Sequence, residues 1–430
     1  MDDLVKKGDG PLPFLSLVTE NLAKKQAGNG GAVVVTASEL SKVRNPSGIV
    51  PSLENAKRAI QQLGIVFRFD LFRQRITIEG YGGHLGVTME DIVLKVRDVI
   101  TERLQFDPEP SHTRDAIRIM ALENAFDPVR EYLDGLKWDG QPRLDSWITR
   151  YLGAEPDELT SAIGQAVLIA AVRRVRKPGC KFDFVMVLEG PQGQGKSTAL
   201  KVLAGGEDFF SDEIAIGVSY KEQQELLQGK WIVELPELVG LRRADIRGVK
   251  QFISKTYDRA RGAFQRDRED APRRCIFIGT TNDAQYLQDP TGNRRFWPVA
   301  TGKIDLAGLA GVRDQLWAEA AAAEVDAADP ITIPESLWSL AAERQAERVA
   351  GDPWEELLVG RLDAAAQLAG GELRISTQAV FEQVLKIDLA EARNSATQRL
   401  ADCMRRLGWE GPKLIRFDAG PARGYWKSLG

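Results

Sequence analysis

Two kinds of apolar pattern alternate along the chain and predict helices and buried strands. In the N-terminal part, residues 53–63 have helical spacing, and residues 65–69 and 75–78 have the composition of short strands. From residue 89 to residue 152 the pattern is helical, and prolines divide it into short helices. We therefore expect a small α+β region followed by a helical region.

The central part contains three apolar runs of strand length, over residues 184–188, 231–235 and 275–279, and the second of them ends in carboxylates. Such runs are typical of strands buried on both faces of a parallel sheet. An amphipathic helix is expected over residues 159–176, and further helices over 306–325 and 334–349. The pattern predicts an α/β core in which strands alternate with helices.

The last part of the chain predicts three short helices, over residues 376–385, 389–393 and 396–407, and a two-strand ribbon over 413–417 and 424–427. Three helices followed by a hairpin is the order of a winged helix. The predicted division of the chain is an α+β region 1–84, a helical domain 85–156, the α/β core 157–303, a helical extension 304–352 and a winged-helix-like domain 353–430.

Composition and charge narrow the classes of protein. The chain has 430 residues and a formal net charge of −4, so any binding to nucleic acid requires a local basic patch. Two histidines and three widely separated cysteines argue against a zinc site or a histidine-based triad. No apolar run approaches membrane-spanning length, and a cytoplasmic location is expected.

A glycine-rich segment directly follows the first buried strand. The spacing Gly190-x4-Gly195-Lys196-Ser197 satisfies the phosphate-binding loop (P-loop) pattern and opens a helix. Glycines allow backbone amides to approach a phosphate, and the helix N-terminus adds its positive dipole end. Lys196 would reach the β- and γ-phosphates of ATP, and the Ser197 hydroxyl would bind Mg²⁺. The predicted nucleotide-binding residues are Gly190, Gln192, Gly193, Gln194, Gly195, Lys196, Ser197 and Thr198. The alternative is a glycine-rich turn that binds nothing.

Two carboxylates follow the second buried strand. A strand beside the P-loop strand is expected to deliver an acid to the Mg²⁺ shell, and a second acid can polarise the attacking water. Glu234 is the candidate for the metal shell and Glu237 for the water, although the two roles are interchangeable on sequence alone. The alternative is a strand followed by a solvated turn.

Further polar residues follow the third buried strand. Asn282 ends this strand at the edge of the sheet that is expected to face the ligand, where it can bind the γ-phosphate or the attacking water. Arg294 and Arg295 lie in a turn shortly after it. Paired arginines at this point suit an arginine finger, which stabilises charge in the transition state. The alternative for either arginine is a salt-bridged surface turn.

The order of these motifs resembles the superfamily 3 helicase ATPases. The segments YLDGLKWDG (132–140), WIVEL (231–235), FIGTTN (277–282) and TGNRRFWP (291–298) are similar to the virulence-associated protein E family. The resemblance covers roughly residues 40–300 and implies a replication ATPase of phages or other mobile elements. The superfamily further implies a homo-oligomer, a hexameric ring, with ATP at the junction between subunits. This chain has Glu where many relatives have Asp in the metal shell, and two residues separate its two carboxylates.

A basic segment lies between the acidic strand and the third strand. Residues 241–274 contain 11 Lys or Arg and five Asp or Glu, a net charge of +6. Residues 244–254 predict a helix, and residues 255–272 predict a hairpin-like insertion. Cations and an aromatic ring suit contact with single-stranded nucleic acid, whereas the alternative is a solvated charged loop. The candidate nucleic-acid residues are Lys250, Lys255, Arg259, Arg261, Phe264, Arg266 and Arg268.

These predictions lead to one primary hypothesis, a Mg²⁺-dependent ATPase that acts as a helicase or translocase on single-stranded or forked DNA during replication of a mobile element. Replication proteins are a further class of partner. The competing hypothesis is an ATP-switched, DNA-binding replication initiator or regulator without unwinding activity. Basic residues of the C-terminal part offer a second place for phosphate contacts. They are Arg393, Arg399, Arg405, Arg406, Lys413, Arg416 and Arg423. A small-molecule kinase is disfavoured by the basic insertion.

Overall fold

The computed structural model describes residues 44–45, 48–80, 88–213, 220–236, 243–261, 268–287, 292–349, 351–388 and 394–428, with the backbone alone at a few positions. These residues fall into two compact units, one ending at Arg348 and the other beginning at Val349, and each is described by itself. Within the described ranges, no helix combines the length and the apolar character that a lipid bilayer requires.

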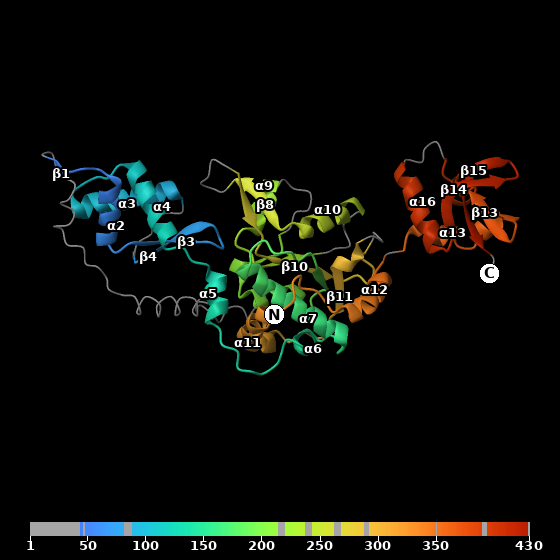
Figure 1. The fold of residues 1–430 in the computed structure, drawn as a ribbon, viewed down its shortest axis with the longest axis horizontal. Helices are drawn as coiled ribbons and strands as arrows, with labels where there is room; N and C mark the ends of the chain where they lie inside the picture. The colour runs from blue at the N-terminus through green and yellow to red at the C-terminus, as the bar shows by residue number, and fades with distance from the viewer. Residues whose placement is uncertain are drawn as a thin grey trace. The chain divides into compact units, whose positions relative to one another are not determined.

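A five-stranded parallel sheet is the centre of the first unit (Figure 1). Its strands lie in the order β11-β5-β10-β7-β6, and all four neighbouring pairs are parallel. The strands are β5 (Val185–Glu189), β6 (Phe210–Ser211), β7 (Ile232–Leu235), β10 (Ile276–Thr281) and β11 (Phe296–Ala300). β5, β7 and β10 are buried along their whole length, as continuous apolar strands should be. The predicted α/β core with a parallel sheet is confirmed.

Two strands of this sheet were not predicted. β6 has only two residues, and β11 contains Pro298. Proline has no N–H to donate to a neighbouring strand, so it is tolerated mainly in edge strands. β11 is an edge strand of this sheet.

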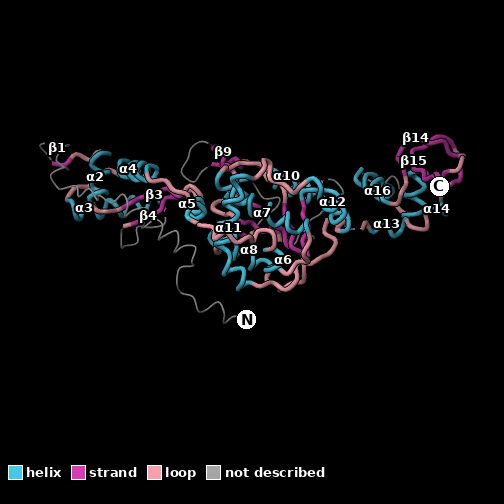
Figure 2. The backbone as a smooth tube through the Cα atoms, turned by 60° about the horizontal axis from the view of Figure 1, so that its bottom comes forward, coloured by secondary structure: helices cyan, strands magenta, loops and turns pink. Residues whose placement is uncertain are grey.

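Helices α7, α8 and α11 pack together beside the sheet (Figure 2), and buried tryptophans join them. They span Glu158–Arg176, Lys196–Ala204 and Leu306–Asp326. The rings of Trp231 and Trp317 are 4.2 Å apart, centroid to centroid. Their indole N–H groups donate to the carbonyl oxygens of Ala171 (3.1 Å) and Leu203 (3.0 Å). Buried indoles with satisfied N–H groups therefore hold the three helices against the sheet that carries the P-loop.

The N-terminal part of the first unit has a hydrophobic cluster of its own. The Ser52 hydroxyl caps the N-terminus of helix α2. The two predicted strands form an antiparallel hairpin, β3-β4. The elements up to the core are β1 (Arg44–Asn45), β2 (Gly48–Ile49), α2 (Leu53–Gln62), β3 (Val66–Asp70), β4 (Arg75–Glu79), α3 (Met89–Leu104), α4 (Pro110–Glu123), α5 (Pro128–Gly135) and α6 (Trp147–Leu152). The α+β and helical character predicted for this region is confirmed.

The basic insertion contains the predicted helix and hairpin. Helix α10 (Arg243–Ser254) is followed by strands β8 (Tyr257–Arg261) and β9 (Arg268–Pro272), which pair antiparallel. The remaining elements of this unit are η3 (Glu207–Phe209), α9 (Tyr220–Leu227), η5 (Asn293–Arg295), η6 (Glu335–Leu337) and α12 (Trp338–Glu347).

The second unit is a four-stranded antiparallel sheet with helices, in the strand order β12-β13-β15-β14. Its elements are α13 (Pro353–Leu358), α14 (Leu362–Ala365), β12 (Gln367–Ala369), β13 (Glu372–Ser376), α15 (Thr377–Ala379), η7 (Val380–Leu385), α16 (Asn394–Arg406), β14 (Glu410–Phe417) and β15 (Gly420–Ser428). The predicted first and third helices and the ribbon are present, while the predicted helix over 389–393 lies outside the described residues.

Strands β12 and β13 were not predicted because they are short and of mixed polarity. Gly370 and Gly371 join them with φ angles of 62° and 79°. β13 pairs with β15, so the ribbon belongs to a larger sheet. The comparison with a winged helix stays a prediction.

Candidate nucleotide-binding site

The P-loop connects β5 to α8, as the motif requires. Gly193 and Gly195 have φ angles of 81° and 89°, which only glycine adopts readily. A Cβ atom at Gly190 would lie 2.5 Å from Gln194 Oε1 and 2.6 Å from Thr301 Oγ1. The loop therefore requires glycine at the positions where the motif has it. The first-turn amides of α8, from Lys196 onward, have no partner within the helix, and such amides are the donors that bind phosphate in P-loops generally.

Lys196 lies across this loop. Its Nζ donates to the carbonyl oxygens of Gly190 (2.6 Å) and Pro191 (2.9 Å). Burial lowers the pKa of the Lys196 ammonium, and the nearby Glu234 carboxylate opposes that shift. The Lys196 ammonium therefore lies against the loop, held by two of its carbonyl oxygens.

Ser197 and Glu234 come together from α8 and β7. The Ser197 hydroxyl donates to Glu234 Oε1 over 2.8 Å, and the Thr280 hydroxyl of β10 donates to the same oxygen. Glu234 is 2% exposed, and its other oxygen, Oε2, is buried without a hydrogen-bond partner among the described residues. A buried carboxylate oxygen beside a hydroxyl fits a Mg²⁺ site whose other ligands are phosphate oxygens and water. The described residues contain no cluster of three or more His, Cys, Asp or Glu that could hold a metal by itself.

Of the two other residues predicted for this site, Asn282 is described by the structure and Glu237 is not. Asn282 directly follows β10, whose last residue, Thr281, is in register with Glu189 at the end of β5, so Asn282 lies beside the start of the P-loop. Its side chain is exposed. Glu237 lies outside the described residues.

A second buried carboxylate, not predicted from sequence, precedes the loop. Glu189 accepts from the Tyr286 hydroxyl (2.9 Å) and from both Nε and Nη2 of Arg348 (3.0 Å each). Burial, and next the charge of Glu189, raise the pKa of Tyr286, whereas the hydrogen bonds to Glu189 raise the pKa of Arg348. The only sequence signal was an acid at the end of an apolar strand, because its arginine partner is 159 positions away.

Replacing Arg348 with glutamine is expected to destabilise the first unit, because Glu189 would lose its bidentate partner while remaining buried. The expected loss in the free energy of unfolding is about 1–3 kcal/mol. Denaturant unfolding of the variant measures it. The matched control is Glu343→Gln, an exposed change in α12, the helix that Arg348 directly follows, and it should stay within about 0.5 kcal/mol of wild type. Equal midpoints for both variants would contradict the role of this ion pair.

The two candidate arginines lie beside the N-terminal ends of the parallel strands, whereas the P-loop follows a C-terminal end. They belong to η5, directly before β11, whose first residue, Phe296, pairs with Val185 at the start of β5. The P-loop follows the other end of β5, five residues away or about 16 Å at ~3.3 Å per residue. Arg295 Nε donates to Asp183 over 3.1 Å, whereas Arg294 is exposed. Neither arginine can therefore complete the P-loop of its own chain.

Residues 133–350 match the family model of the virulence-associated protein E-like domain. The chain belongs to this family. The matched region contains the P-loop, Glu234, Asn282, both arginines and Arg348, so the whole candidate site is part of the virulence-associated protein E-like domain. The family resemblance drawn from the sequence is confirmed.

Comparisons with solved structures and curated proteins add little to the family match. One solved structure, described as the apo structure of the NrS-1 C-terminal region (305–718), is 13% identical over 86% of this chain and 97% of that chain, with a TM-score of 0.46. A second, described as its A form, is 13% identical over 87% and 99%, with a TM-score of 0.44. Similarity at this level carries no argument about function. Among curated proteins, none matches the chain.

The candidate nucleic-acid residues of the virulence-associated protein E-like domain differ in their surroundings. Lys250 is 8% exposed and reaches Asn293 of η5 (3.4 Å), so it packs inside the domain and does not offer a free surface. Lys255 is half-buried, 6.0 Å from the centre of the Phe252 ring. Arg259, Arg261 and Arg268 lie on the β8-β9 hairpin, where only the backbone is described, and Phe264 and Arg266 lie outside the described residues.

Arg273 also contributed to the predicted excess of positive charge, but it is structural. It is 3% exposed and forms a two-point ion pair with Asp258 (2.6 and 2.8 Å) while its guanidinium lies over the Phe252 ring. The pair holds the base of the hairpin and leaves the net charge of +6 unchanged, because Asp258 was already counted. Arg274 pairs with Asp127, which lies outside the segment, so this contact does reduce the charge available for phosphates.

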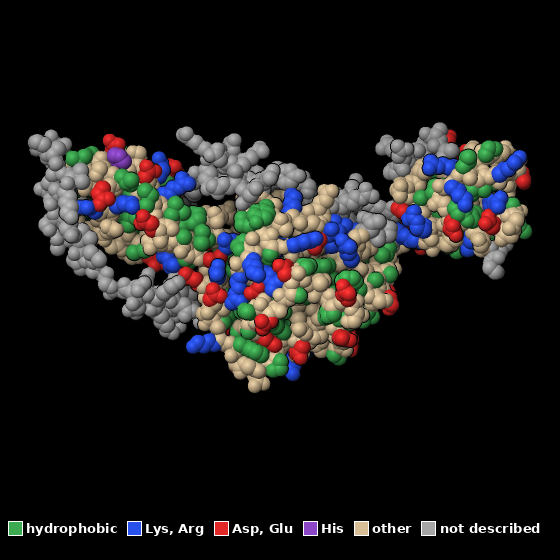
Figure 3. All heavy atoms as spheres, viewed as in Figure 1, with side chains coloured by type: hydrophobic (Ala, Val, Ile, Leu, Met, Phe, Trp, Pro, Cys, Tyr) green, Lys and Arg blue, Asp and Glu red, His purple; other side chains and the backbone are tan. Residues whose placement is uncertain are grey.

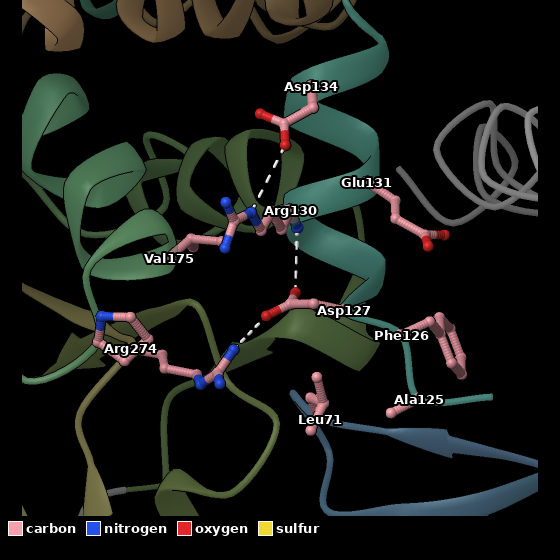
Figure 4. Close-up of a pocket in the computed structure, with 10 residues that line it drawn as sticks. Leu71, Ala125, Phe126, Asp127, Arg130, Glu131, Asp134, Val175 and Arg274 are labelled. Atoms are coloured by element: carbon pink, nitrogen blue, oxygen red, sulfur yellow. Dashed lines mark hydrogen bonds and ion pairs between the residues drawn. The ribbon is translucent and has the colours of Figure 1, made fainter. Parts of the chain in front are cut away.

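A polar pocket lies near the start of α5, away from the P-loop residues (Figure 4). Asp127 accepts from the backbone N–H of Arg130 (3.0 Å) and from the Arg274 guanidinium, and Arg130 Nε lies 3.6 Å from Asp134. Burial raises the pKa of Asp127, and the hydrogen bond from Arg130 opposes this. The pair of Asp127 with Arg274 joins α5 to the segment before β10.

Proposed function

We propose that this chain is a Mg²⁺-dependent ATPase. The observation that supports it best is the Glu234 carboxylate, which lies against Ser197 and Thr280 with one buried oxygen left without a partner among the described residues. A carboxylate beside Ser197, the second residue of the P-loop helix, has a physical reason to stay buried there if a divalent cation binds it. An inert glycine turn offers no such reason.

Each residue has a separate task in the proposed site. The amides at the start of α8 bind the phosphates, and Lys196 neutralises the β- and γ-phosphate oxygens. Ser197 and Glu234 hold Mg²⁺, which supplies charge neutralisation on the phosphates when bound. Asn282, beside the loop, is proposed to orient the γ-phosphate or the attacking water, and Glu237 to polarise that water.

The arginine that completes the site is proposed to come from a neighbouring copy of the chain. Arg294 is exposed and lies at the edge of the sheet opposite the P-loop, so it is available to a neighbour and not to its own ATP. Arg295 is engaged with Asp183 and is proposed to fix the turn that presents Arg294. The proposal requires a homo-oligomer, and the superfamily resemblance favours a ring of six.

The proposed substrate of the motor is DNA during replication of a phage or another mobile element. The family membership supports this context, and the β8-β9 hairpin is the element proposed to contact single strands. The competing function is an ATP-switched initiator or regulator that binds DNA without unwinding it.

Hydrolysis assays on the full chain test the proposal. ATP turnover should require Mg²⁺, rise with single-stranded DNA, and fall about 10²–10³-fold in the Glu234→Gln variant, which removes one charge at the proposed metal ligand. Turnover that is unchanged by chelation of Mg²⁺ would refute the proposed site. Strand displacement on forked DNA then separates the two functions, because an initiator or regulator would hydrolyse or bind ATP without separating the strands.

A further inference from the structure

The basic side chains of the C-terminal unit fall into two groups. The arginines of α16 are occupied by ion pairs, which join Arg399 to Asp352 (2.6 Å), Arg406 to Glu355 (2.9 Å) and Arg405 to Asp402 (3.2 Å). Arg399 also lies over the Trp354 ring. The pairs of Arg399 and Arg406 join α16 to the start of α13 and so hold the unit together, whereas the Arg405 pair lies within α16.

The cations of the β14-β15 hairpin have a different environment. Within the described part of the chain, no ion pair involves them, and most are exposed. They are Lys413, Arg416, Arg423 and Lys427. Residues 410–428 contain these four cations and two acids, a net charge of +2 in a chain whose total is −4. Figure 3 shows basic and hydrophobic side chains interspersed over this unit.

One face of the sheet covers the core and the other does not. Tyr425 of β15 and its partner Ile375 of β13 are 0% and 2% exposed and belong to the core of the unit. Side chains alternate along a strand, so Trp426 points to the opposite face. Its ring is partly exposed there. Phe417, which is also partly exposed, lies close to Gly424 on the same hairpin.

A cation accompanies the Trp426 ring. Lys413 pairs across the strands with Gly424, two residues before Trp426, and its Nζ lies 3.4 Å from the centre of the ring. Lys413 is exposed, so its flexible side chain can move aside and keep its ammonium at the rim of the ring. An aromatic platform with a mobile cation at its rim is the arrangement that stacks a base and neutralises its phosphate.

We propose that the outer face of the C-terminal sheet binds single-stranded nucleic acid, with a base stacked on Trp426 and a phosphate held by Lys413. Arg416 pairs with Pro421, and Arg423 lies two residues before Tyr425, so both point to the opposite face and the phosphate contact beside Trp426 depends on Lys413. A duplex keeps its bases stacked inside, so Trp426 selects single strands. This site lies in a different unit from the P-loop and does not depend on the proposed ATPase.

Binding of a fluorescent oligothymidine to the full chain, without nucleotide, tests the site by anisotropy. Trp426→Leu, which keeps an apolar side chain in place, and Lys413→Gln should each weaken binding about 5–20-fold, in line with the loss of one stacked base or one phosphate contact. Trp426→Phe should restore most of the affinity because it restores the stacking ring. The matched control is Arg405→Gln, whose side chain is 64% exposed on α16 and which should bind as wild type does.

Photo-crosslinking to an oligonucleotide that contains 5-iodouracil maps the contact independently of affinity. Crosslinks are expected in the peptide that contains Trp426. The proposal would be overturned by crosslinks confined to the first unit, or by equal affinities of Trp426→Leu and wild type for the oligothymidine. It would also be overturned if Trp426→Leu weakened the binding of duplex DNA as much as that of the single strand. ATP hydrolysis measured on the same variants should be unchanged without DNA, so failure of this site and failure of the ATPase are distinguishable.

Discussion

Replacing Lys196 with alanine is expected to abolish most ATP hydrolysis, with a fall in turnover of about 10²–10³-fold. The ammonium lies across the P-loop, where it donates to the carbonyl oxygens of Gly190 and Pro191, so no other described cation occupies that position. Steady-state turnover with saturating Mg²⁺ and ATP measures the effect, and nucleotide binding should weaken in parallel.

The control for this variant is Lys201→Ala on the same helix. Lys201 is paired with the exposed Glu207, and its own side chain is 40% exposed. Its loss should leave turnover within about twofold and stability within about 0.5 kcal/mol of wild type. Rapid hydrolysis by the Lys196→Ala variant would remove the catalytic claim for the P-loop.

Replacing Arg294 with alanine is expected to reduce turnover by about 10³–10⁵-fold, the range for removal of an arginine finger, without weakening the fold. Arg294 is exposed at the N-terminal ends of the strands, opposite its own P-loop, so it is placed to serve the site of a neighbouring copy. Mixing this variant with Lys196→Ala is the decisive measurement. If sites are shared between copies that mix at random, about a quarter of the junctions in an equal mixture regain both groups, and activity reappears.

Arg295→Ala provides the contrast. Its ion pair with Asp183 stabilises the start of β5, so its removal should lower thermal stability. Turnover of Arg295→Ala alone should fall far less than that of Arg294→Ala, because Arg294 is still present. A mixture of the Lys196→Ala and Arg294→Ala variants that stays inactive, although sizing shows that the copies exchange, would contradict a shared site.

The sequence determined the local features of this protein. Largely apolar runs specify β5, β7 and β10, because strands buried on both faces are mostly apolar, and the few polar residues in them lie at or near their C-terminal ends. The P-loop was readable because Gly193 and Gly195 need positive φ angles and Lys196 opens a helix. The β8-β9 hairpin was readable from a charged stretch between two recognisable elements. Each of these depends on neighbouring residues, which a sequence shows directly.

Tertiary structure alone decided which distant residues meet. The ion pair of Glu189 with Arg348 joins positions 159 apart, and the Thr280 hydroxyl reaches Glu234 from a neighbouring strand. Arg294 and Arg295 look equivalent in sequence, yet only the packing of η5 against the start of β5 gives one of them an internal partner. Lys250 and Arg273 looked like surface cations and are buried. Charge is counted along the chain, but its availability depends on which carboxylates and rings the fold brings to it, and local sequence does not specify those contacts.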